Sequence, residues 1–209
     1  MEKKKKQTLI GLFNKYDTTN RGSISEEQLF NLLNKHGYEF SKSTVENIIG
    51  YHTTSDTINL KTFLEINDTL VNCHYLFMSA DSKNRHKEYV THNELFKAFK
   101  AGNFDFSKKN FKVIFDLVDD NNDNKCQFEE FVYLYLLISG VKLIFTIEDQ
   151  DESGTLNIDE FLNFMPKLGI RIRKNEARQI FNQMDSNNDG QFSLTEVITL
   201  IMKLQNMDY

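Results

Sequence analysis

The sequence has little of what marks a secreted or a nucleic-acid-binding chain. Its 209 residues include two cysteines, one proline and nine glycines, and the net charge is −5. The cysteines, Cys73 and Cys126, lie far apart and cannot make a disulfide framework, which favours a reducing compartment. Nucleic-acid-binding surfaces neutralise phosphates with an excess of lysine and arginine, so the negative charge argues against nucleic acid as a partner. Scarce proline and glycine are typical of an all-helical protein with short connections.

Long apolar runs are also missing. The longest, from Phe131 to Ile138, has eight residues, whereas a membrane-spanning helix needs about 18. The basic run Lys3 to Lys6 precedes an apolar stretch that is too short for a signal peptide and has no small-residue cleavage site. We therefore expect a cytoplasmic protein, with association with vesicles or granules left open. The lysine run is either a solvated helix start or an attachment point for an anionic membrane surface.

An internal repeat organises the chain. A polar loop that follows an aromatic-rich helix and ends in an acidic and then an apolar residue recurs along the sequence. In chain order we number the copies loop one (17–28), loop two (51–62), loop three (from Asp81 or Lys83 to Glu94), loop four (119–130), loop five (149–160) and loop six (185–196). Loops four, five and six are the clear copies. Loops one, two and three are degenerate.

The connections between loops indicate how the units are joined. Segments 63–80 and 131–148 lack proline and can each run as one helix of about 27 Å. The longer connections contain breakers or caps, including a capping box predicted at Ser43 and Glu46. Apolar residues at loop position 8 predict three cross-strand contacts: Ile24 with Ile58, Val90 with Cys126, and Leu156 with Phe192. We therefore expect an all-α fold of six helix–loop–helix units in three pairs joined by shared helices, divided as residues 1–75, 76–139 and 140–209.

The three clear loops offer oxygen donors at the spacing that calcium requires. Calcium takes six to eight oxygens, and a twelve-residue loop supplies them from positions 1, 3 and 5, the carbonyl of 7, position 9 and a bidentate acid at 12. Gly154 and Gly190 occupy the sharp turn at position 6, and Asn124 replaces glycine there with a small penalty. The predicted ligands are, in loop four, Asp119, Asn121, Asp123, the carbonyl of Lys125 and Glu130; in loop five, Asp149, Asp151, Ser153, the carbonyl of Thr155 and Glu160; and in loop six, Asp185, Asn187, Asp189, the carbonyl of Gln191 and Glu196.

Loops one to three lack this donor set. Loop one keeps Asp17 but places Arg21 at position 5 and Gln28 at position 12, and an amide cannot supply two anionic oxygens. Loop two begins with Tyr51 and ends with Thr62. Loop three carries a run of cations at Lys83, Arg85 and Lys87. We interpret these loops as structural partners and leave weak binding by the Asp17 loop open.

This layout resembles the EF-hand superfamily over nearly the whole chain, and we call each loop with its flanking helices a hand. The alternating connection lengths are similar to those of the calpain-type penta-EF-hand group, in which successive hands share a helix. That family dimerises through an unpaired fifth hand, but loop six supplies a partner here, so monomer and dimer both stay open. The lysine- and asparagine-rich composition and the ion-free front half are also similar to those of the amoebic granule proteins called grainins.

These patterns predict a calcium sensor or buffer with about three sites in its C-terminal half. A sensor would expose apolar surface to a protein target or an anionic membrane when calcium binds. The alternatives are a non-catalytic, calcium-regulated subunit of a larger complex and a calcium-storage protein of granules or vesicles. The sequence contains no nucleophile elbow, phosphate-binding glycine loop or HExxH helix, so we do not expect an enzyme.

Overall fold

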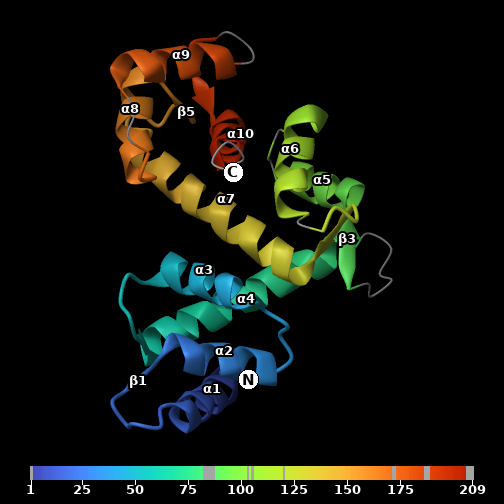
Figure 1. Ribbon diagram of the computed structural model, residues 1–209, viewed down its shortest axis with the longest axis vertical. Coiled ribbons are helices and arrows are strands. Elements are labelled where there is room, and N and C mark those ends of the chain that lie inside the picture. Colours follow the sequence, from blue (N-terminus) through green and yellow to red (C-terminus); the bar gives the residue numbers. More distant parts are fainter. Residues whose placement is uncertain are drawn as a thin grey trace. The chain divides into compact units, whose positions relative to one another are not determined.

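The computed structural model is mostly helical and describes residues 2–81, 88–102, 104, 106–119, 121–170, 173–185 and 189–205. Short strands connect the helices (Figure 1). The predicted all-α class is confirmed. In chain order the elements of the described residues are α1 (Glu2–Tyr16), β1 (Ser23–Ile24), α2 (Glu26–Lys35), α3 (Lys42–His52), β2 (Ile58–Asn59), α4 (Leu60–Ala80), β3 (Tyr89–Thr91), α5 (His92–Ala101), α6 (Lys108–Val118), β4 (Lys125–Gln127), α7 (Phe128–Glu148), β5 (Thr155–Leu156), α8 (Ile158–Lys167), α9 (Lys174–Met184), β6 (Phe192–Ser193) and α10 (Leu194–Gln205).

The strands pair the loops two by two, as the sequence predicts. β1 pairs with β2, β3 with β4 and β5 with β6. Ile24 lies opposite Ile58, and Leu156 lies opposite Phe192, both in antiparallel register. These four side chains are almost fully buried. Each apolar residue at loop position 8 therefore contributes to a core that two hands share.

Two long helices carry the chain from one loop to the next. α4 and α7 are each continuous, which confirms the prediction for segments 63–80 and 131–148. By length and composition α7 is apolar enough to cross a membrane, but the core helix of a soluble protein passes the same test. Val132, Leu134 and Val141 are buried along its length. Leu143 and Ile147 on the same helix are exposed, so α7 packs along only part of its apolar surface.

The chain forms two compact units: Met1–Tyr89 with Gln127–Leu136, and Val90–Cys126 with Leu137–Tyr209. Each has its own core of aromatic and branched side chains. The boundaries 1–75, 76–139 and 140–209 stay a prediction from the sequence. The first unit buries Phe13, Leu29, Ile48, Phe63 and Ile66, and the second buries Phe111, Phe115, Phe161, Phe164 and Phe192.

One predicted helix start is wrong. The capping box expected at Ser43 and Glu46 is absent, because α3 begins earlier and its N-cap is Ser41. Ser41 has the extended backbone that an N-cap needs, and its hydroxyl accepts a hydrogen bond from the Thr44 amide at 3.2 Å. Ser43 is the second residue of α3 and therefore cannot be its N-cap.

Candidate metal centre

Loop five gathers its carboxylates most closely. Oxygens of Asp149, Asp151 and Glu160 all lie within 4.8 Å of one another. Asp149 follows the last turn of α7, and its two carboxylate oxygens accept hydrogen bonds from the amides of Ser153 (3.0 Å) and Gly154 (2.9 Å). These two hydrogen bonds hold the backbone of the loop in a turn around the Asp149 carboxylate. The loop thus turns its oxygens toward one point, as a calcium shell requires.

The turn within loop five needs an unusual backbone. Gly154 has φ +79°, in the left-handed region that glycine enters without steric cost. Beside it, the hydroxyl and amide of Ser153 hydrogen-bond to Asp151 and hold the pKa of that carboxyl below its ordinary value. Asp151 is therefore ionised over a wider pH range, which suits a cation ligand. The last ligand, Glu160, lies in the first turn of α8, where it accepts from the amides of Gln150 (3.1 Å) and Asn157 (2.9 Å).

Loop six repeats the hydrogen bonds around its first aspartate, although among the described residues only loop five brings three acids within 4.8 Å of one another. Asp185 accepts hydrogen bonds from the amides of Asp189 (3.3 Å) and Gly190 (2.9 Å), and Gly190 has φ +74°. Glu196 is buried and accepts from the amide of Ser193 at 3.0 Å. The predicted ligand Asn187 lies outside the described residues.

Loop four follows the same plan with two departures. Asp119 is buried, and its carboxylate accepts from the amides of Asp123 (3.0 Å) and Asn124 (2.9 Å). Asn124 has φ +59°, so asparagine adopts the left-handed turn that glycine takes in the other two loops. The Lys125 ammonium lies 3.8 Å from a carboxylate oxygen of Asp123, where it competes with a bound cation. Both departures predict that loop four is the weakest of the three sites. The position-12 acid, Glu130, accepts from the amide of Gln127 at 2.7 Å.

The donor chemistry of these loops fits calcium. The side-chain donors are oxygens of Asp, Asn, Ser and Glu, and the described position-7 residues, Lys125, Thr155 and Gln191, would add their carbonyls. Hard oxygen donors without thiolate or imidazole suit calcium or magnesium rather than zinc. Loops five and six are also tied together, because the Thr155 hydroxyl donates to the Gln191 side chain at 3.2 Å.

Loop one has the same backbone shape but closes without an acid at position 12. Asp17 is buried and accepts from the Gly22 amide at 2.7 Å. Gln28 accepts from the Ser25 amide at 2.8 Å and donates to the Thr18 hydroxyl at 3.2 Å. An amide thus forms the hydrogen bonds that fix the loop, but it supplies no second anionic oxygen.

Loops two and three differ from each other at position 12, where loop two has Thr62 and loop three has Glu94. In loop two Asn59 caps α4 by accepting from the Thr62 amide at 3.0 Å. In loop three the amide and the hydroxyl of Thr91 donate to Glu94, as those of Ser193 donate to Glu196 in loop six, so loop three keeps its position-12 acid. The cations predicted to disable loop three, Lys83, Arg85 and Lys87, lie outside the described residues.

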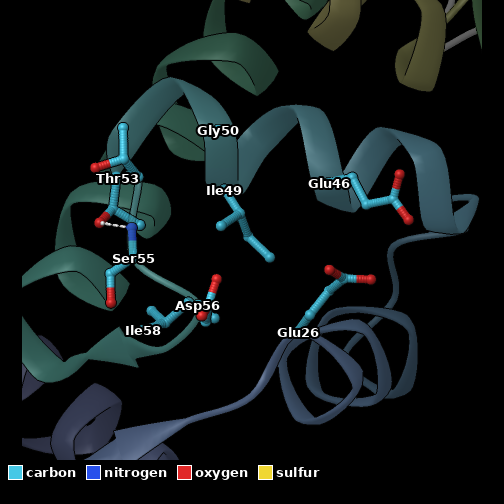
Figure 2. Close-up of a pocket in the computed structure, with 9 residues that line it drawn as sticks. Glu26, Glu46, Ile49, Gly50, Thr53, Ser55, Asp56 and Ile58 are labelled. Carbon is cyan, nitrogen blue, oxygen red and sulfur yellow. Dashed lines mark hydrogen bonds between the residues drawn. The ribbon is translucent and has the colours of Figure 1, made fainter.

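A pocket of about 230 Å³ lies beside loop two in the first unit. Glu26 of α2 and Glu46 of α3 extend toward each other across it, and Asp56 lies at its wall (Figure 2). All three carboxylates are exposed to solvent. No described ligand of loops four to six lines this pocket, so it is separate from the candidate calcium sites.

Comparison with known proteins agrees with this geometry. Models of the EF-hand domain pair match residues 86–135 and 139–202. The chain is similar to calerythrin of Saccharopolyspora erythraea (40% identity over 53 residues, covering 25% of this chain and 29% of calerythrin). It is also similar to calcium-dependent protein kinase 31 of Arabidopsis thaliana (31% identity over 71 residues, covering 34% of this chain and 15% of the kinase).

A solved structure shows the same fold. It is a homolog of programmed cell death 6 protein from Leishmania major Friedlin, with a TM-score of 0.59 and 22% identity over 75% of this chain and 91% of that one. Two EF-hand pairs together with the loop geometry define the class. The chain belongs to the EF-hand family and is a calcium-binding protein. The resemblance to amoebic grainins stays a prediction.

Proposed function

We propose that this protein is a non-catalytic calcium sensor that holds about three ions, one in each of loops four, five and six. One observation supports this assignment most directly. In each of these loops the first aspartate is fixed by the amides of positions 5 and 6, and a glutamate stands at position 12 in the first turn of the next helix. Loops one to three serve as structural partners in this proposal.

A sensor, rather than a buffer, is favoured by the apolar content of the C-terminal pair. Met165 and Met202 are fully buried beside the aromatic core. In sensor hands, calcium moves the position-12 glutamate and its helix, and the pair opens to expose a groove lined by such side chains. Because Glu160 and Glu196 lie in the first turns of α8 and α10, ion binding acts directly on the helices that cover this core. The groove would receive an apolar face of a protein target.

An apolar dye distinguishes the two modes of action. We expect calcium to raise dye fluorescence with the wild-type chain but not with a Glu160→Gln, Glu196→Gln double variant. Glu152→Gln is the matched control, because this glutamate lies in loop five at a position that supplies no side-chain ligand. Calcium uptake without a rise in dye fluorescence would contradict the sensor and favour a buffer or a granule-storage protein.

An anionic membrane is a second proposed partner. The side chains of Lys4, Lys5 and Lys6 are exposed on α1, and each lysine near an anionic surface contributes about 1 kcal/mol. Sedimentation with phosphatidylserine vesicles should then fall steeply as salt rises. Binding equal to that on neutral vesicles would exclude this partner. Co-purification of a larger protein only with calcium would instead support the regulated-subunit alternative. The proposed location is the cytoplasm, which the small number of cysteines, both of them buried, supports.

A further inference from the structure

The first turn of α7 serves two purposes at once. It carries Glu130, the position-12 acid of loop four, and directly before it come Phe128 and Glu129. These two preceding residues contact hands one and two, within the first unit. The loop that ends at Glu130 and the ion-free hands therefore share one helical turn.

Glu129 caps a helix that is remote in sequence. Its carboxylate accepts hydrogen bonds from the Ser41 amide at 2.7 Å and from the Thr44 hydroxyl at 2.5 Å. These groups lie at the N-terminus of α3, where the helix dipole and free amides favour a negative charge.

Phe128 lies in an aromatic cluster on the same hands. Its ring centroid is 5.4 Å from that of Phe77 and 5.6 Å from that of His74, both edge to face. The rings of Phe40 and Tyr38 stack at 6.0 and 6.2 Å. Such pairs are specific in their geometry. Together with Glu129 they fix both the position and the rotation of the first turn of α7.

We propose that hands one and two, although they bind no ion themselves, tune calcium affinity at loop four by holding this turn. A bidentate acid must be placed within a few tenths of an ångström of the ion, so fixing its helix in advance lowers the ordering cost of binding. Thr44 and Glu129 are then positioning residues for Glu130. Coupling is reciprocal, so calcium at loop four must in turn stabilise α3. This inference rests on the proposed function, because it requires loop four to bind calcium.

The test uses the full chain and a substitution at a residue that is not itself a ligand. Thr44→Val removes one partner of Glu129 while preserving side-chain shape. Thr62→Val is the matched control, since Thr44 and Thr62 are 7% and 8% exposed and lie in the same hand, but no hydrogen bond joins Thr62 to α7 in the described residues. In calorimetric titration we expect Thr44→Val to lower the calcium affinity of loop four, the site that Glu130→Gln removes. The expected decrease is about fivefold, a typical coupling between two sites. The other two sites and the control should be unchanged.

Hydrogen exchange supplies the reciprocal measurement. Calcium should slow exchange in residues 41–52 of the wild-type chain, and Glu130→Gln should abolish this slowing. Glu129→Gln, which removes the charge at nearly the same side-chain shape, should behave as Thr44→Val does. The proposal would be contradicted if both variants bound calcium at loop four within twofold of the wild-type affinity and calcium did not change exchange in α3. The contact between Glu129 and α3 would then only stabilise the fold. Failure of the proposed function would give a different result. The wild-type chain and the Glu130→Gln variant would then bind the same number of calcium ions.

Discussion

The substitution Phe192→Ala tests whether the candidate ion sites in loops five and six form one structural unit. The ring of Phe192 is fully buried, stacks on Phe181 with centroids 4.3 Å apart, and meets Phe161 edge to face at 4.9 Å. It also lies opposite Leu156 in the ladder between loops five and six. Truncating a buried phenylalanine to alanine costs about 3–5 kcal/mol. Against the 5–15 kcal/mol that stabilises an ordinary domain, Phe192→Ala should leave the second unit marginal.

Urea unfolding in a calcium chelator, followed by circular dichroism, measures this loss. Leu143→Ala is the control, since Leu143 is 60% exposed on α7 and its truncation should change stability by less than about 0.5 kcal/mol. Calorimetric titration should also show weaker binding at loops five and six together, because one ladder positions both. A loss under about 1 kcal/mol, or weakening of loop six alone, would refute the argument that the two loops form one structural unit.

Three further predictions concern pH, the left-handed turn and loop one. Burial and the Lys112 ammonium lower the pKa of His92, whose Nε2 is buried without a partner in the described residues. Below pH about 6.5 the unfolded chain therefore binds more protons at His92 than the folded chain does. The contribution of His92 to the free energy of unfolding is complete above that pH and is lost as pH falls, by at most about 1.4 kcal/mol per pH unit. Urea unfolding from pH 8 to 5.5 should show this slope, and His92→Phe should reduce it; an equal slope would contradict the assignment. Asn124→Ala should cost about 1 kcal/mol by the same assay and weaken loop four, whereas Asn124→Gly should cost nothing, because only alanine is strained at φ +59°. Arg21→Asp with Gln28→Glu should add an ion to the calorimetric stoichiometry, since it restores the acids at positions 5 and 12; an unchanged stoichiometry would show that loop one is disabled by more than its ligands.

The repeat made the fold predictable. Apolar residues at loop position 8, such as Ile24 and Leu156, specify which loops pair, and the structure confirms both contacts. The continuous helix over 131–148 was likewise predictable from the absence of proline, and the structure extends it to Phe128–Glu148. These features are local or periodic, so a single sequence carries them. The ligand types were predictable for the same reason, and in loop five the structure brings the three acids together.

Contacts between distant segments were not predictable. Glu129 reads in the sequence as an ordinary exposed acid before the ligand Glu130, yet it accepts hydrogen bonds from residues 85 and 88 positions away. The same contact explains why α3 starts without a glutamate capping box, because Glu129 meets the free Ser41 amide instead. Tertiary packing decides such caps, and no periodic pattern encodes them.

Calcium occupancy of the three loops is measured most directly by calorimetric titration of the metal-free full chain. Glu130→Gln, Glu160→Gln and Glu196→Gln each remove a carboxylate that supplies two oxygens to one ion. The account predicts about three ions for the wild-type chain and the loss of about one with each substitution. Six ions, none, or a stoichiometry that the substitutions leave unchanged would contradict it.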